Sequence, residues 1–192
     1  MRWAEPRPRF QANRRNPAMR AQTTRNHFDA NPGEPVTAND RTRFDIPALV
    51  DHIVERYHRT HLRELPYAIG LARSVEELYA DDPNCPIGLA DHLTAMAEDL
   101  DAHQWREETM LFPMLRIGTP HCLNFVTRRM MEDHIDTELQ IIRLRRLTKG
   151  YRPSFEAPFC WQALSALCRK LERDLREHAR LEDEILYAML PT

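Results

Sequence analysis

The stretch "LDAHQWREETMLFPML", residues 100–115, reads as the buried face of a helix into which two polar side chains have been placed. Its apolar residues return every three or four positions, which is the period of an amphipathic helix. His103 and Glu107 occupy positions on that apolar face and lie four residues apart, so both project from the same side of the helix. This pattern predicts a helix whose inward face carries an imidazole and a carboxylate.

A second stretch, "LREHARLEDEILYAML" at residues 175–190, repeats the first. Aligning His103 with His178 also aligns Glu107 with Glu182. The same alignment pairs Leu111 with Leu186, Phe112 with Tyr187, Met114 with Met189 and Leu115 with Leu190. Two more histidines extend the repeat, because His58 precedes His103 by 45 residues and His134 precedes His178 by 44. The chain therefore reads as two copies of one unit, a helix with one histidine followed by a helix with His-x3-Glu.

The chain from residue 46 onward is expected to form four helices, at about 46–79, 88–116, 121–149 and 154–189. The segments "DDPNCP" and "GTP" and the glycine Gly150 end the first three, Pro66 predicts a kink, and Ser154 is expected to cap the last. Short connections favour antiparallel neighbours. The predicted fold is therefore all-α, an antiparallel four-helix bundle over residues 46–192.

Residues 1–45 differ from the rest of the chain in composition. They contain nine arginines and five acidic residues. The segment is also rich in Asn and Pro and shows no hydrophobic periodicity. Such a segment buries too little apolar surface to offset its chain entropy, so an irregular, disordered basic arm is expected. Met19 within it is an alternative start.

Overall composition excludes several classes of protein. The formal net charge of −2 gives no reason to expect a nucleic-acid partner, and no apolar run approaches the ~18 residues of a membrane span. The N-terminus lacks the apolar core of a signal peptide. The four cysteines show no CxxC spacing and are typical of free thiols in a reducing compartment. We expect a soluble cytoplasmic protein.

The helical period assigns an inward face to each helix. The second helix is expected to present Leu93, Met96, Leu100, His103, Glu107, Met110 and Met114, and the fourth Leu164, Cys168, Leu171, Leu175, His178, Glu182, Ile185 and Met189. In the first helix the face includes His58 and then either His61 or Leu62, and in the third it includes His134. Antiparallel packing of the two copies brings these polar residues to one level of the core.

Six inward side chains are candidate metal ligands: His58, His103, Glu107, His134, His178 and Glu182. An ionised carboxylate in an apolar core costs several kcal/mol unless it is paired or binds a metal, and no Lys or Arg lies on these faces. Imidazole and carboxylate ligands suit Fe, Mn, Co or Zn, and a carboxylate can bridge two ions about 3.5–4 Å apart. The alternative is a purely structural bundle with ordinary core histidines. A single His-x3-Glu pair favours that alternative, whereas the repeated pair with its two matched histidines favours a metal pair.

Several neighbours have weaker assignments. Asp133 is a candidate to orient a ligand histidine, whereas Glu108 is expected on a solvated face. His61 is interpreted as a donor behind the ligands, a channel residue or an ordinary histidine. Tyr187 is the aromatic residue most expected to border the site. An apolar wall is expected from Leu62, Leu65, Leu100 and Met110.

Four motifs in order, "VERYHRTHLRELP", "LDAHQWREETMLFPML", "MEDHIDTEL" and "REHARLEDEILYAML", resemble the hemerythrin-like di-iron domain of the repair-of-iron-centres proteins. The resemblance covers roughly residues 48–190 and implies a four-helix bundle with a non-haem centre of two iron ions, bridged by carboxylate or oxo groups. It implies that the four histidines are terminal ligands and that Glu107 and Glu182 are bridging. Oxygen-carrying hemerythrins differ in using five histidines with one Glu and one Asp.

The resemblance implies a protein of the nitric-oxide and oxidative stress response. Proteins of this kind often carry an N-terminal domain with a Cys-Cys pair, whereas no cysteine here precedes Cys85. We therefore expect a metal-based protein that binds NO and lowers free NO, rather than a conventional enzyme. The alternative is repair of damaged iron–sulfur clusters by iron donation, with iron–sulfur proteins as partners. Binding or sensing of O2 is a third and less favoured function.

Overall fold

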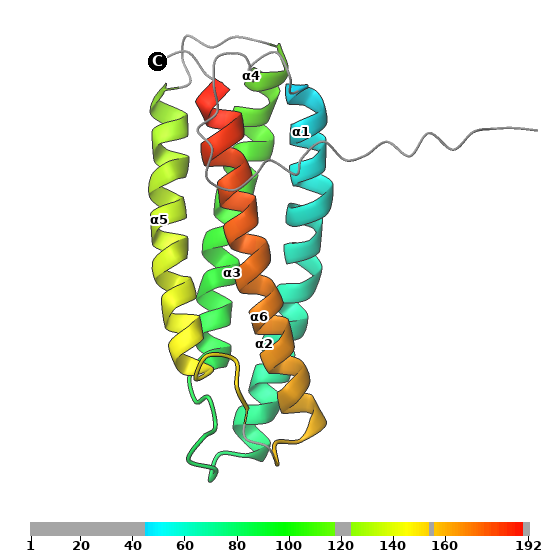
Figure 1. Ribbon diagram of the computed structural model, residues 1–192, viewed down its shortest axis with the longest axis vertical. Helices are drawn as coiled ribbons and strands as arrows, with labels where there is room; N and C mark the ends of the chain where they lie inside the picture. The colour runs from blue at the N-terminus through cyan, green and yellow to red at the C-terminus, as the bar shows by residue number, and fades with distance from the viewer. Residues whose placement is uncertain (1–44, 118–123, 154–155, 190–192) are drawn as a thin grey trace, which may run out of the picture. The chain divides into compact units, whose positions relative to one another are not determined.

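The computed structural model describes residues 45–117, 124–153 and 156–189, and within them every regular element is helical. These elements join end to end into four continuous helical rods, which pack together as a bundle (Figure 1). Their segments are α1 (Ile46–Ile53), η2 (Val54–His58) and α2 (Arg59–Leu78); α3 (Leu89–Arg106), η3 (Glu107–Leu111) and α4 (Phe112–Ile117); α5 (Asn124–Leu147); and α6 (Phe159–Arg180), η5 (Leu181–Leu186) and η6 (Tyr187–Met189). The predicted all-α four-helix bundle is confirmed. The expected arm over residues 1–45 lies, apart from Asp45, outside the described residues.

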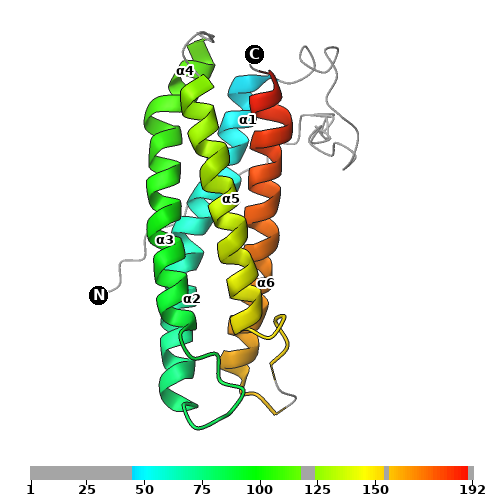
Figure 2. The ribbon, with the colours of Figure 1, turned by 90° about the vertical axis from the view of Figure 1, so that its left-hand side faces the viewer.

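The rods run up and down in sequence order, as Figures 1 and 2 show. Helix α2 packs against both α3 and α6, and α5 packs against the same two helices. The first and third rods therefore lie diagonally across the bundle, as do the second and fourth. This arrangement places the two copies of the repeated unit opposite one another.

The helix ends follow from their backbone chemistry. Gly88 precedes α3 with a φ of 84°, and Gly150 follows α5 with a φ of 74°, a left-handed conformation that glycine adopts without strain. The expected start of the last helix near Ser154 is wrong, because α6 begins at Phe159 after Pro158. A proline fits immediately before a first turn, since its missing N–H has no helical partner there. Ser154 itself lies outside the described residues.

The half of the bundle near the 79–88 and 148–158 connections is filled with apolar side chains. Its fully buried members include Ala72, Val75, Leu89, Leu93, Leu144, Leu164 and Cys168. The Cys168 thiol is completely buried, and burial raises its pKa to about 12, so it packs as a small neutral side chain. This half therefore contains the hydrophobic core of the bundle.

Three of the four rods contain a π-helical turn, and each lies at a predicted ligand position. In η3 the N–H of Phe112 reaches back five residues to the carbonyl of Glu107. The corresponding bonds join Arg59 to Val54 in η2 and Tyr187 to Glu182 in η5. A π turn inserts one extra residue, so it rotates the following residues by about 100° relative to a regular helix.

Because of this rotation, part of the predicted inward face of the second helix is wrong. Met110 was expected in the core but is 47% exposed, whereas Leu111 is completely buried. Leu115 likewise replaces Met114, which is half-buried. Pro113 lies just after the turn and cannot donate to the preceding carbonyls, which favours the wider turn there.

Among the described helices, none combines the length and the apolar character needed to cross a membrane.

Candidate metal centre

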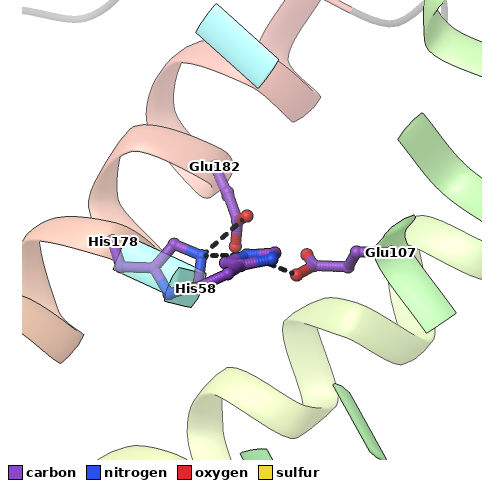
Figure 3. Close-up of side chains that lie close together, drawn as sticks. All are labelled: His58, Glu107, His178 and Glu182. Atoms are coloured by element: carbon purple, nitrogen blue, oxygen red, sulfur yellow. Dashed lines mark hydrogen bonds and ion pairs between the residues drawn. The ribbon is translucent and has the colours of Figure 1, made fainter. Parts of the chain in front are cut away.

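The structure brings together all six predicted ligand side chains, one or two from each rod. Figure 3 shows four of them, with two imidazoles and two carboxylates pointing toward one another. Glu107 and Glu182 are 0% exposed, at the first position of η3 and the second of η5. The histidines come from η2, α3, α5 and α6. Together they form two groups of four: His58, His178, Glu107 and Glu182, and His103, His134, Glu107 and Glu182.

The first group is closely packed. The Nε2 atoms of His58 and His178 lie 3.1 Å apart, and His178 Nε2 lies 3.0 Å from Glu182 Oε1. His58 Nε2 lies 3.4 Å from Glu107 Oε2. All four side chains are buried, so the group is shielded from solvent.

The second group mirrors the first. The Nε2 atoms of His103 and His134 lie 3.3 Å apart. His103 Nε2 lies 3.3 Å from Glu107 Oε2, and His134 Nε2 lies 3.1 Å from Glu182 Oε2. Each group combines the lone histidine of one copy with the paired histidine of the other, and both copies supply the shared glutamates. Neither copy of the repeat alone contains a complete group.

Three of the histidines are held at Nδ1 by a carboxylate. Glu108 lies 2.9 Å from His58, Asp183 lies 2.9 Å from His134, and Asp133 lies 3.4 Å from His103. An ionised carboxylate accepts the Nδ1 proton, which leaves the Nε2 lone pair directed toward the group. Glu108 was expected on a solvated face, and this interpretation was wrong. The copies match here too, because Glu108 and Asp183 each directly follow a shared glutamate.

The hydrogen-bonding state of the six side chains indicates whether they are suited to bind metal ions. With Nδ1 protonated, the Nε2 lone pairs converge with carboxylate oxygens, and all of these atoms are hydrogen-bond acceptors. Within the described residues, the buried oxygens Glu107 Oε2 and Glu182 Oε2 have no hydrogen-bond donor as long as the histidines carry their protons at Nδ1 only. Buried acceptors that face one another require a cation between them. The donor set therefore fits two adjacent metal ions that share Glu107 and Glu182.

Without metal, protons take over part of this role. Burial opposes a charge on His134, but hydrogen bonds to Asp183 and Glu182 outweigh it and raise the histidine's pKa to about 10. Burial likewise opposes ionisation of Glu182, but His178 and His134 together hold its pKa well below the ordinary value. Protons and metal ions thus compete for the same positions.

Aromatic rings cover the two lone histidines at matching positions of the repeat. Phe112 stacks on His58 with ring centroids 5.7 Å apart, and Tyr187 stacks on His134 at 6.2 Å. The Tyr187 hydroxyl also donates a 2.8 Å hydrogen bond to Glu107 Oε1. The prediction that Tyr187 borders the site is confirmed.

The surroundings of the centre differ on its two sides. Between α2 and α3 lies a pocket of about 250 Å³ with mostly apolar walls, including Leu65 and Leu100. Of the other residues expected in an apolar wall, Leu62 lines this pocket but is 59% exposed, and Met110 faces solvent. Between α3 and α5 lies a polar cleft of about 410 Å³, which His103 itself lines.

His61, whose role the sequence left open, is buried at the inner part of the α2–α3 pocket with 1% exposure. Its Nδ1 accepts a 3.1 Å hydrogen bond from the Gln104 amide nitrogen. Burial, together with nearby His178 and His58, lowers the pKa of His61 to about 3, so the ring is neutral.

Comparison with known proteins identifies a matching family model and several similar proteins. The family model of the hemerythrin HHE cation binding domain matches residues 49–190. The iron-sulfur cluster repair protein YtfE of Dickeya chrysanthemi is 34% identical over 154 residues, which cover 80% of this chain and 70% of that protein. The protein of the same name from Salmonella typhimurium is 36% identical over 139 residues, with coverages of 72% and 63%.

A third relative is the "Probable iron-sulfur cluster repair protein" of Haemophilus influenzae. It is 32% identical over 148 residues, which cover 77% of this chain and 66% of the relative. The chain thus spans roughly two thirds of the length of the curated relatives that it matches.

Proposed function

Because the chain belongs to the hemerythrin HHE cation binding domain family, we propose that it is a di-iron protein that takes part in repairing damaged iron–sulfur clusters. The relatives' names favour this alternative over NO binding, which was preferred from the sequence. The observation that carries the proposal is the pair of adjacent His/Glu groups that share Glu107 and Glu182. Proteins with damaged iron–sulfur clusters are the proposed partners.

In this proposal His58 and His178 would hold one iron, His103 and His134 would hold the other, and Glu107 and Glu182, which belong to both groups, would be shared between them. Iron is supported by the ligand chemistry, since imidazole and carboxylate together suit this metal. When bound, iron would supply both a change of redox state and the ion that rebuilding a cluster consumes. The chain's own residues fix the ligand atoms: Glu108 and Asp183 hold their histidines at Nδ1, which keeps each Nε2 available.

Donation requires that an iron can leave, and the polar cleft beside His103 supports this. The cleft is lined by polar and charged groups, among them Asp133, Asp136 and Arg106. Asp133 also binds Arg106 and Arg129, so the carboxylate behind His103 is shared among three partners. The contact that supports His103 is 3.4 Å long, against 2.9 Å for His58 and His134, so His103 is less firmly oriented.

The proposal is tested with an iron–sulfur enzyme that NO or peroxide has inactivated. The iron-loaded chain should restore activity beyond what an equal amount of free ferrous iron restores. The matched control is the Glu107→Gln/Glu182→Gln variant, which keeps the side-chain shapes but removes both shared carboxylate charges. Equal recovery with the wild-type chain, the variant and free iron would reject the proposal.

A second candidate function is binding of NO, and the apolar pocket between α2 and α3 favours it. Its mostly apolar wall admits a small neutral molecule more readily than an ion, and the ring of one lining residue, His61, lies 5.7 Å from that of His178. Anaerobic addition of NO to the ferrous chain should produce a new absorption spectrum. An unchanged spectrum from a chain shown to contain iron would exclude this function.

A further inference from the structure

A cleft of about 880 Å³ lies between the C-terminal end of α5, the loop that follows it and the exposed side of α6. None of the six candidate metal ligands lines it, so it is separate from the metal centre. Of the ten described residues that line the cleft, two are acidic and six are arginines: Arg145, Arg152, Arg169, Arg173, Arg176 and Arg180. The lining is therefore strongly basic, in a chain whose formal net charge is −2.

At one end of the cleft the arginines are paired with carboxylates. Arg176 lies 2.7 Å from Glu138 and also binds Glu172. Arg180 lies 2.7 Å from Glu177. The positive charge at this end is therefore largely compensated by the protein itself.

At the other end three arginines lack a close acidic partner. Within the described part of the chain, Arg152 and Arg169 form no ion pair, and Arg169 instead donates a 2.8 Å hydrogen bond to the carbonyl of Tyr151. Arg173 lies 3.9 Å from Asp174, a carboxylate that is already bound by two closer cations. These three guanidinium groups therefore carry positive charge that the described residues leave uncompensated.

The backbone is strained where the loop joins this end of the cleft. Lys149, Gly150 and Tyr151 have φ values of 50°, 74° and 63°. The left-handed conformation is unfavourable for a residue with a β-carbon, and it persists only where the surroundings hold it, often at a binding site. The Tyr151 ring is buried, its carbonyl is held by Arg169, and the next residue, Arg152, is exposed at the cleft. The strained turn thus sets Arg152 next to the residue that Arg169 binds.

We propose that this end of the cleft binds an anion with two or more linked phosphate groups, held by Arg152, Arg169 and Arg173. Guanidinium forks match phosphate oxygens in pairs, and Arg169 and Arg173 lie one turn apart on the same side of α6. Linked phosphates concentrate several negative charges in a compact group, whereas an acidic peptide carries one charge per side chain. The site is distinct from the metal centre and does not depend on the proposed function.

The proposal is tested by isothermal titration of the iron-loaded full-length chain with inorganic diphosphate, ATP and orthophosphate. Diphosphate and ATP should bind at least tenfold more tightly than orthophosphate, and their affinity should fall as the salt concentration rises. Equal affinities for diphosphate and ATP would assign recognition to the phosphates alone, and tighter binding of ATP would identify a nucleotide as the source of the phosphates.

Two double variants locate the site. Arg152→Gln/Arg173→Gln removes two guanidinium groups without disturbing Arg169, which holds the turn, and should weaken diphosphate binding about a hundredfold, or about tenfold for each charged contact. Arg63→Gln/Arg73→Gln makes the same change of charge at exposed positions of α2 and should leave the affinity within about twofold. Equal losses in the two variants would overturn the proposal.

A second readout separates binding in the cleft from binding of diphosphate to iron. Phenylglyoxal modifies accessible guanidinium groups, and peptide mass spectrometry identifies which ones have reacted. Diphosphate should protect Arg169 and Arg173 and leave Arg63 reactive, whereas equal reactivity with and without diphosphate would contradict the proposal. An acidic peptide or an oligonucleotide that binds through the same arginines more tightly than ATP would also overturn it, because the cleft would then be part of a larger docking surface.

Discussion

On one side of the centre aromatic rings stack on both histidines, His58 and His178, whereas on the other side Tyr187 stacks on His134 and His103 lines a polar cleft. His178 stacks on Tyr57 with centroids 5.4 Å apart and planes at 5°, and the His58 and His178 side chains are 0% and 3% exposed. The His103 and His134 side chains are 6% and 9% exposed. The ligand atoms are alike on both sides, but their access to water differs.

A single position of the repeat accounts for much of this difference. The residue before the lone histidine is Tyr57 in one copy and Asp133 in the other. Each contacts the paired histidine of the opposite copy, Tyr57 through its ring and Asp133 through its carboxylate. The two copies of the repeat therefore provide the same candidate ligands, while the residues next to these ligands give the two metal positions different surroundings.

The largest effect is expected at the residues that both sides share. Glu107→Ala or Glu182→Ala removes a ligand from both groups at once, so both ions should be lost. A change behind the ligands typically costs about 10–100-fold in metal affinity, and loss of a shared ligand should exceed that. Metal content per chain is the measurement, with Glu77→Ala on the exposed face of α2 as the control. Retention of one tightly bound ion would show that the glutamates are not shared.

The next largest effect concerns the rates at which the two ions leave. A ferrous chelator should remove iron in two phases, the faster from the His103 and His134 side. Asp133→Asn should accelerate the fast phase and Glu108→Gln the slow one, each by about 10–100-fold. A single phase, or a slow phase that responds to Asp133→Asn, would contradict the difference between the sides.

Some of the residues in these predictions could be identified from the sequence, and others could not. The six candidate ligands could be found because their spacing is repeated and because buried carboxylates without cations need a metal. Glu108 and Asp183 were missed, since each reaches a histidine on another rod and sequence periodicity places them toward solvent. Met110 was misplaced because a π turn shifts the register, and a pattern based on a regular helix does not contain that turn.

The pH dependence of metal binding should expose the proton competition at His134. In the metal-free chain this histidine has a pKa of about 10, so at neutral pH it is protonated and must lose its proton when a metal binds. Affinity should therefore rise with pH up to about 10, by about tenfold per unit for one displaced proton. Asp183→Asn removes a contact that raises this pKa and should flatten the rise. An affinity that is constant over this range would argue against His134 as a ligand.

The smallest effect on metal affinity is expected at Tyr187, which differs from its counterpart Phe112 by one hydroxyl group. Tyr187→Phe makes the second copy resemble Phe112 in the first and removes the hydrogen bond to Glu107. The change should cost about 1 kcal/mol, or about fivefold in metal affinity, while stacking on His134 remains. Isothermal titration with a divalent metal measures this, and a loss above a hundredfold would mean that the hydroxyl does more than support Glu107.

The most direct test of the account is a crystal structure of the iron-loaded chain with anomalous diffraction at the iron edge. We predict two iron peaks about 3.5–4 Å apart. One should lie among His58, His178 and the two shared glutamates, and the other among His103, His134 and the same glutamates. A single peak, or iron bound away from Glu107 and Glu182, would contradict the account.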